Sequence, residues 1–192
     1  MAEKQGLPII AFPSQEAFEK WLEAEHESPG LWLQIAKKES GIPSVTYAEA
    51  LDLALCFGWI DGQKAAFDDD HWLQRFTPRK ARSKWSKVNR GRAEQLIAAG
   101  RVRPAGLAQI EAAKADGRWE AAYAGQKTAT VPDDLRAALD ADPAAAEFFA
   151  TLDGRNRYSI LYRVNDAKKP ETRAARIEKF VTMLRENKKI YP

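Results

Sequence analysis

The sequence predicts an α+β fold, in which an N-terminal region with a small mixed or antiparallel sheet of about four strands and helices precedes an all-helical C-terminal region. Three observations support this prediction. Short apolar or alternating runs bounded by turn residues, which are typical of strands, occur at residues 8–12, 30–37, 59–67 and 71–77. Apolar residues recur at helical spacing between and after these runs. A stretch without a strong period, residues 120–131, connects an α+β domain of residues 1–119 to helical residues 132–192.

The first helices have recognisable starts. Ser14 follows the first strand and provides an N-cap for the helix after it. Thr46 and Glu49 have the spacing of a capping box, in which each residue satisfies a backbone amide of the other. We therefore expect a helix over residues 47–57, closed by Gly58.

Turn residues and prolines mark the later elements. The aspartates at 68–70 interrupt the strand pattern and predict the tip of a hairpin. Ser83 or Ser86 can cap the next helix, which ends near Gly100. The remaining helices are expected to begin at Pro104, Pro132, Pro143, Arg155 and Glu171.

The composition, 45% hydrophobic and 30% charged over 192 residues, is that of a globular protein. No apolar stretch approaches the roughly 20 residues that a membrane-spanning helix needs, and the first residues lack the basic and apolar regions of a secretory signal. We therefore expect a cytoplasmic protein without membrane insertion. The single cysteine, Cys56, falls on the apolar side of an expected helix, which favours a core residue over a nucleophile.

Charge is divided unevenly along the chain. Residues 1–74 carry 13 acidic and 5 basic side chains, whereas residues 75–103 carry 10 basic side chains and the single acid Glu94. We call residues 75–103 the basic segment. Such a segment can be the footprint of a polyanion, or it can be a solvated helix face that lies beside its own acidic N-terminal region.

Several blocks of the sequence carry a family resemblance. They are residues 56–62 (CFGWIDG), 74–79 (QRFTPR), 83–89 (SKWSKVN), 100–106 (GRVRPAG), 113–119 (AKADGRW) and 167–173 (AKKPETR). In these blocks the chain resembles the bacterial YdeI/OmpD-associated, or bacteriocin-protection, family over nearly its whole length. The resemblance implies a protective or stress-associated role and names no reaction. We therefore expect a non-catalytic protein that acts by binding and needs no cofactor.

The side chains best suited to binding gather between residues 59 and 89. Arg79, Ser83 and Ser86 can place a guanidinium, hydroxyls and free helix amides around one small anion. Asp61 and Arg75 can face each other if they lie on adjacent strands, and the alternative is then an Asp61–arginine ion pair that braces the hairpin. The full candidate set is Trp59, Asp61, Lys64, Arg75, Thr77, Arg79, Ser83, Trp85, Ser86 and Asn89.

Other functions leave weaker signals. Nucleic acid is an alternative partner, because the basic segment interleaves arginines and lysines with Phe76 and Trp85, but no recognised reader motif is present. An uncharacterised enzyme with a pocket around Asp61 and Arg79 is a further alternative, and a protein partner is another. His26 and His71 lack metal-ligand spacing, so we expect no metal site.

Overall fold

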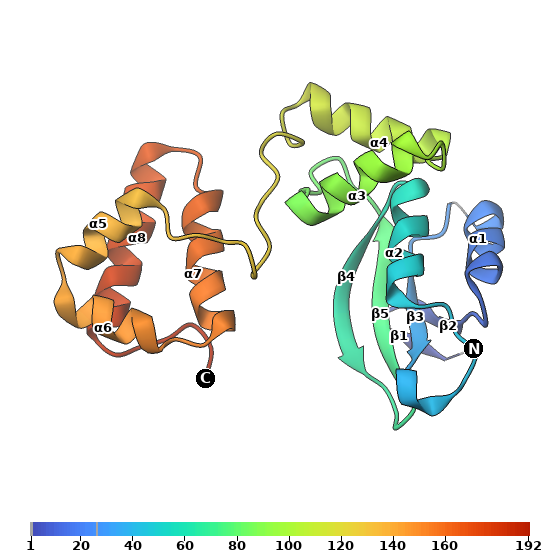
Figure 1. The fold of residues 1–192 in the computed structure, drawn as a ribbon, viewed down its shortest axis with the longest axis horizontal. Coiled ribbons are helices and arrows are strands. Elements are labelled where there is room, and N and C mark those ends of the chain that lie inside the picture. The colour runs from blue at the N-terminus through green and yellow to red at the C-terminus, as the bar shows by residue number, and fades with distance from the viewer. Residues whose placement is uncertain (1, 26) are drawn as a thin grey trace. The chain divides into compact units, whose positions relative to one another are not determined.

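The fold, in a computed structural model that describes residues 2–25 and 27–192, consists of two units, Met1–Ala122 and Tyr123–Pro192. Met1 and His26 lie outside the described residues. Figure 1 shows strands and helices together in the first unit and helices alone in the second.

The N-terminal unit is built on a mixed sheet with the strand order β1-β2-β3-β5-β4 (Figure 1). Strands β2 and β3 are parallel, and the other neighbouring pairs are antiparallel. Helix α1 (Gln15–Ala24) forms the crossover between the two parallel strands. The strands are β1 (Glu3–Lys4), β2 (Leu7–Ala11), β3 (Leu31–Ala36), β4 (Trp59–Ala66) and β5 (His71–Pro78).

The α+β class is confirmed, but the separation of strands from helices is only partial. Within the described residues the sheet has five strands, because β1 forms a short hairpin with β2 that the sequence pattern does not reveal. Helix α1 and helix α2 (Tyr47–Cys56) lie between strands along the chain, as does a single 3₁₀ turn (Lys38–Ser40). The capping box of Thr46 and Glu49 begins α2 as predicted.

Helix α2 is buried on two sides and joins two apolar clusters. Its residues Leu53 and Ala54 pack with α1 against one face of the sheet. Leu55 and Cys56 instead pack against helices α3 (Lys87–Ala98) and α4 (Pro104–Ala115). Burial raises the pKa of the Cys56 thiol, so this residue is a core residue and a poor nucleophile.

Two of the family blocks meet where α4 crosses the end of α2. Gly58 and Gly106 face the backbone of the other segment there: a Cβ atom on Gly106 would lie 2.2 Å from the Cys56 carbonyl oxygen, and one on Gly58 would lie 2.9 Å from that of Ala105. The Arg103 amide donates to the Cys56 carbonyl oxygen at 3.0 Å. Blocks 56–62 and 100–106 therefore have a structural reason to contain glycine.

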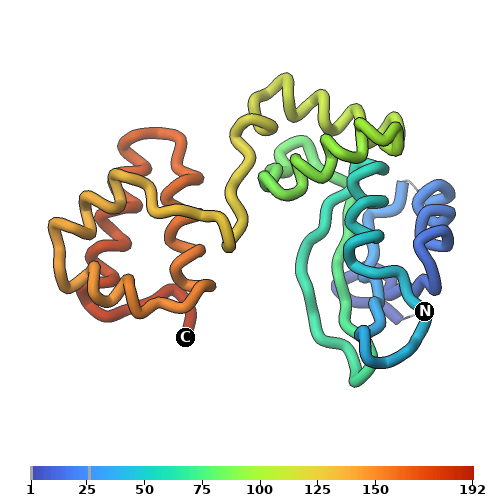
Figure 2. The backbone as a smooth tube through the Cα atoms, in the orientation of Figure 1, coloured from blue at the N-terminus to red at the C-terminus, as the bar shows by residue number. Residues whose placement is uncertain are grey.

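The C-terminal unit consists of four helices within the described residues (Figure 2). They surround a core that includes Leu135, Phe149, Ile160 and Leu184. No helix of the described chain is long and apolar enough to cross a membrane. The four helices are α5 (Asp133–Asp140), α6 (Pro143–Thr151), α7 (Gly154–Asp166) and α8 (Pro170–Arg185).

The family block at residues 167–173 ties these helices together. Pro170 occupies the first turn of α8, where its missing amide hydrogen costs no hydrogen bond. Arg173 donates to both carboxylate oxygens of Asp134 on α5 and to the Val164 carbonyl oxygen near the end of α7. One arginine therefore connects three helices, and this structural role accounts for the arginine of the block without a bound ligand.

Acid should weaken this unit through its capping carboxylates. Asp142 caps α6, and hydrogen bonds from Arg185 and from the Ala145 amide lower the pKa of its carboxyl. A carboxyl with a lowered folded-state pKa stabilises the fold above its unfolded pKa of about 4, and this contribution is lost as the pH falls through the lowered value. We expect Asp142→Asn, which keeps a capping side chain, to lower the thermal midpoint measured by circular dichroism at pH 6. This difference from the wild type should disappear in acid, and a difference that persists there would show that Asp142 does not act through its charge.

Candidate functional site

Asp61 lies on the helix-covered face of the sheet, between β4, α2 and α3. Its carboxylate accepts hydrogen bonds from the Tyr47 hydroxyl at 2.9 Å and from the Asn89 side-chain amide at 3.2 Å. Asp61 is half-buried, and both donors are neutral. This network connects one strand to two helices, so it holds α2 and α3 in place against the hairpin. The sequence identifies Asp61 and Asn89 but gives no signal for Tyr47.

Arg75 does not face Asp61. The register pairs Asp61 of β4 with Phe76 of β5, whereas Arg75 of β5 pairs with Trp32 of β3, on the other side of β5. Because successive residues of a strand point to opposite faces of the sheet, Arg75 and Thr77 lie on the face that the helices do not cover. The prediction that Asp61 and Arg75 can face each other is therefore wrong, although β4 and β5 are adjacent as that prediction requires.

Lys64 and Gln74 occupy the irregular part of the hairpin. The Lys64 ammonium lies 4.2 Å from the centroid of the Trp72 ring, a cation–π contact. Between Asp61 and Lys64 the strand pairing shifts, and the buried Gln74 amide donates to the freed Gly62 carbonyl oxygen at 2.9 Å. Gln74 thus supports a bulge, and a glutamine among the apolar residues of a strand is the signal that could have revealed it.

Arg79 is a buried residue that stacks on Trp85. Only 6% of its surface is exposed, its guanidinium carbon lies 3.5 Å from the centroid of the Trp85 ring, and it donates to the Lys84 carbonyl oxygen at 3.2 Å. Trp85 in turn packs edge-on against Trp119, with 4.8 Å between centroids. Trp59 is buried in the apolar cluster between the sheet and helices α1 and α2. These contacts favour a structural role for Arg79, Trp85 and Trp59.

Ser83 and Ser86 use their hydroxyls locally. The Ser86 hydroxyl accepts a hydrogen bond from the backbone amide of Asn89 at 3.0 Å and caps α3. The Ser83 hydroxyl accepts from the backbone amide of Lys80 at 2.9 Å, in the turn before the helix. Of the two serines that can cap this helix, Ser86 is therefore the cap. Both hydroxyl oxygens retain the ability to donate a hydrogen bond to an anion.

Two arginines of the basic segment form ion pairs with acids of helices α1 and α2. Arg92 pairs with Asp52 on α2. Arg103 pairs with Glu19 at 3.0 Å and with Glu23 at 3.1 Å, both on α1. This part of the basic segment therefore lies beside its own acidic region, as one of the two interpretations of the charge division expects.

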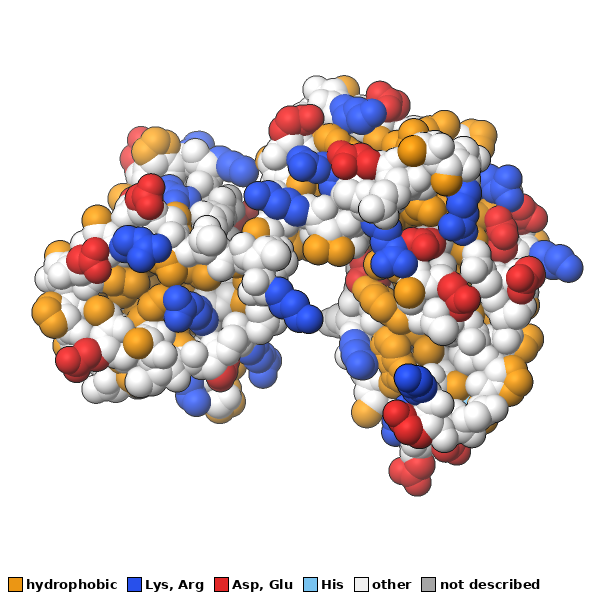
Figure 3. Space-filling model, in the orientation of Figure 1, with side chains coloured by type: hydrophobic (Ala, Val, Ile, Leu, Met, Phe, Trp, Pro, Cys, Tyr) orange, Lys and Arg blue, Asp and Glu red, His pale blue; other side chains and the backbone are white. Residues whose placement is uncertain are grey.

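Four cations of the segment remain exposed without an ion pair among the described residues, and one of them, Arg101, lies beyond the end of α3. The other three are Lys80, Arg82 and Lys87, which we call the loop cations. They lie in the loop before α3 and at its first residue, and the first turn of α3 contains no acidic residue. Figure 3 shows acidic and basic side chains interspersed on the face drawn, rather than one broad basic surface.

His71 and Asp68 stabilise the tip of the hairpin. Asp68 accepts hydrogen bonds from the backbone amides of Asp70 and His71, and its carboxylate lies 2.9 Å from the His71 ring nitrogen Nδ1. These bonds lower the pKa of Asp68. Over the described residues, no group of three or more histidine, cysteine, aspartate or glutamate side chains is arranged to hold a metal ion.

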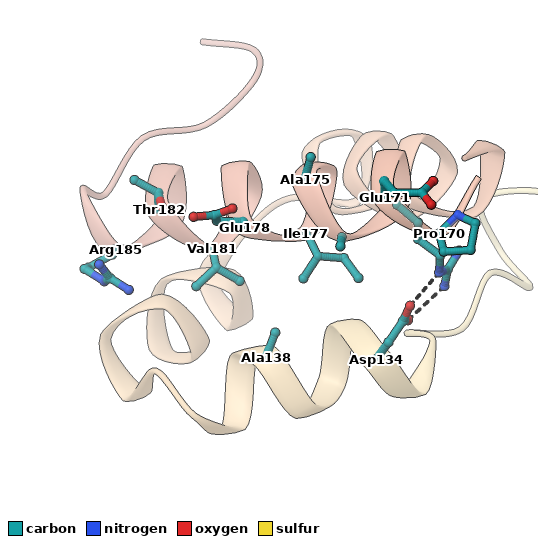
Figure 4. A pocket seen from close by; sticks show the side chains of 12 residues that line it. Asp134, Ala138, Pro170, Glu171, Ala175, Ile177, Glu178, Val181, Thr182 and Arg185 are labelled. Atoms are coloured by element: carbon teal, nitrogen blue, oxygen red, sulfur yellow. Dashed lines mark hydrogen bonds and ion pairs between the residues drawn. The ribbon is translucent and has the colours of Figure 1, made fainter. Parts of the chain in front are cut away.

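The C-terminal unit has a groove of about 870 Å³ between α5 and α8. Figure 4 shows Ile177 and Val181 of α8 pointing toward Ala138 of α5, with the ion pair of Asp134 at one end. Glu171 and Glu178 also line it. Its floor is apolar and its edge is charged, and it contains no side chain from the set that the sequence proposes for binding.

Comparisons with known proteins give two family matches. Residues 10–109 match the model of a family described as a domain of unknown function (DUF8412). Residues 128–187 match the model described as bacteriocin-protection, YdeI or OmpD-associated. No curated protein and no solved structure gives a significant match.

Proposed function

We propose a non-catalytic protective or stress-associated role in the cytoplasm for this chain. The chain belongs to the DUF8412 family of unknown function and carries a bacteriocin-protection, YdeI or OmpD-associated domain at residues 128–187. In this proposal the protein acts by binding a multiply charged anion at the loop before α3. The family description supports the protective role, and the residues between 59 and 89 supply the binding surface.

The observation that carries the proposal is the exposure of the loop cations. Neighbouring arginines contact acids of α1 and α2, whereas Lys80, Arg82 and Lys87 have no ion pair among the described residues. Lys87 is the first residue of α3, where the helix dipole favours a negative charge. An anion at this position would offset the charge of all three side chains and of the helix start.

The ligand should be small and multiply charged. Exposed ion pairs contribute little each, about 0.5 kcal/mol, so several charges are needed for useful affinity. The loop cations are confined to the loop before α3 and its first residue, which suits a compact anion better than a long nucleic acid. Arg79 contributes indirectly in this proposal, because its stacking on Trp85 holds the loop in place.

Inorganic tripolyphosphate is a suitable probe for this surface. We expect it to shift the backbone amide resonances of Lys87 and Val88 saturably in nuclear magnetic resonance spectra. The triple variant Lys80→Ala, Arg82→Ala, Lys87→Ala should bind about tenfold more weakly, with an unchanged thermal midpoint because all three side chains are exposed.

A matched variant controls for net charge. Lys20, Lys38 and Lys179 are also exposed, so replacing these three with alanine removes the same charge elsewhere and should leave the affinity for tripolyphosphate almost unchanged. Equal weakening in both triple variants would contradict a local site. Tighter binding of a single-stranded DNA decamer, with affinity that falls steeply as salt rises, would replace the proposal with nucleic-acid binding.

A further inference from the structure

The sheet of the N-terminal unit has one face that its helices do not cover, which we call the open face. Helices α1 and α2 pack on the opposite face (Figure 1), with Leu33 and Phe76 of the strands. The apolar cluster on the open face consists of the strand residues Leu7, Trp32 and Leu73. By register, Arg75 lies beside Trp32 on this face.

Two hydrogen-bond donors on the open face lack acceptors. The indole nitrogen Nε1 of Trp32 and the guanidinium nitrogen Nε of Arg75 are both shielded from solvent, and neither has a hydrogen-bond partner among the described residues. Trp32 as a whole is only 1% exposed. A buried N–H without an acceptor destabilises the fold, and here two such groups lie on directly paired residues of neighbouring strands.

The charge of the open face is positive and uncompensated. Arg75 is half-buried and has no ion pair within the described part of the chain. The Lys4 ammonium lies 5.3 Å from the centroid of the Trp32 ring. The strand residues that share this face by register include no aspartate or glutamate: they are Lys4, Leu7, Ile9, Ala11, Trp32, Gln34, Ala36, Ile60, Ala65, His71, Leu73, Arg75 and Thr77.

The chemistry of these groups points to one ligand class. A carboxylate has two oxygens that can accept from two N–H donors at once, and its single charge matches the Arg75 guanidinium. Leu7 and Leu73 are buried beside Trp32, so the hydrocarbon part of an organic acid that entered beside the indole would meet apolar side chains. Inorganic phosphate has no such part and is more strongly hydrated.

Access requires movement of Lys4, because its side chain lies over the Trp32 ring. Lys4 belongs to β1, a strand of two residues at the edge of the sheet. A turn with positive φ at Gln5 and Gly6 connects it to β2. So short an edge strand opens easily, and the Lys4 ammonium can then contact the bound carboxylate.

We propose that the open face holds a binding site for a small organic carboxylate, formed by Trp32, Arg75 and Lys4. The site is separate from the loop cations and does not depend on them. Arg75 and Thr77 belong to the set that the sequence proposes for binding, whereas Trp32 and Lys4 are new to it. No sequence pattern marks them, because the site forms only when β1, β3 and β5 come together in the sheet.

The indole N–H of Trp32 reports directly on this site. The chain has six tryptophans, and each gives one side-chain resonance in a ¹H–¹⁵N spectrum of the full protein. Trp32→Phe identifies the Trp32 resonance, which we expect to shift saturably with sodium hexanoate at constant ionic strength. The other five resonances should stay in place, and sodium phosphate should cause no comparable shift.

Two variants of Arg75 keep the test decisive. Arg75→Met removes the charge and the donors, and should weaken hexanoate binding at least tenfold while the other five indole resonances confirm the fold. Arg75→Lys keeps the charge without the planar guanidinium and should weaken binding several-fold. A Trp32 resonance that does not move with hexanoate, moves equally with phosphate, or moves equally in Arg75→Met would overturn the proposal.

Discussion

Replacing Arg79 with alanine should lower the free energy of unfolding of the N-terminal unit by about 3 kcal/mol. The guanidinium is buried against the Trp85 ring and donates to the Lys84 carbonyl oxygen. Its removal eliminates a desolvated cation–π contact, leaves that carbonyl without its donor and creates a cavity beside Trp85. Urea unfolding followed by tryptophan fluorescence measures the effect, because all six tryptophans lie in this unit.

Arg82 provides the matched control for this prediction. It is three residues away in the same loop, but it is exposed, so Arg82→Ala should change the free energy of unfolding by less than about 0.5 kcal/mol. The opposite pattern for Arg79→Ala, with stability unchanged and tripolyphosphate binding abolished, would contradict the structural role. Arg79 would then be a ligand-contacting residue, as the sequence pattern allows.

Gly106→Ala should destabilise the N-terminal unit by about 3 kcal/mol or more. The added Cβ would lie 2.2 Å from the Cys56 carbonyl oxygen and 2.8 Å from a methyl group of Val102. The first contact is with backbone, so no change of side-chain rotamer can relieve it. Helix α4 would have to move away from α2, which would weaken the hydrogen bond from the Arg103 amide to that carbonyl. Urea unfolding followed by tryptophan fluorescence again measures the loss.

Gly91 shows what the same substitution does without a close neighbour. It lies inside α3, and a Cβ atom there would have nothing within 4 Å. Gly91→Ala should therefore stabilise the protein by about 0.5–1 kcal/mol through helix propensity. If Gly106→Ala and Gly91→Ala had similar effects, the close approach of α4 to α2 would not be a determinant of this fold.

Local signals predict most of the secondary structure. Ser14, Thr46 and Ser86 each begin a helix through a side-chain hydrogen bond to the backbone, which is an interaction between residues close in sequence. The hairpin tip follows from the aspartates at 68–70 for the same reason. Strand β1 escapes prediction because two residues cannot show an alternating pattern, and its pairing depends on β2.

The candidate site is harder to predict because its members depend on register. A shift of one residue along a strand moves a side chain to the other face of the sheet, and this difference separates Arg75 from Asp61. Tyr47 contacts Asp61 across 14 positions of sequence, and Arg103 contacts Glu19 across 84. The sequence therefore indicates which side chains can act, but not which of them lie together.

The division of the basic segment into paired and unpaired cations also depends on contacts between residues distant in sequence. Its charge is visible in the sequence, but the partners of Arg92 and Arg103 come from α1 and α2, which are far away along the chain. Only the folded structure separates these paired arginines from the loop cations. The proposed anion site depends on this separation, since it leaves Lys80, Arg82 and Lys87 available to an anion beside the start of α3.

Native mass spectrometry of the full chain purified from its own cells shows whether an anion occupies this site. We expect the wild type to carry a multiply charged anion in a one-to-one ratio, released on denaturation, and the variant Lys80→Ala, Arg82→Ala, Lys87→Ala to carry none. An anion retained equally by this variant, or a wild-type protein that releases no anion, would rule out an anion site at the loop cations.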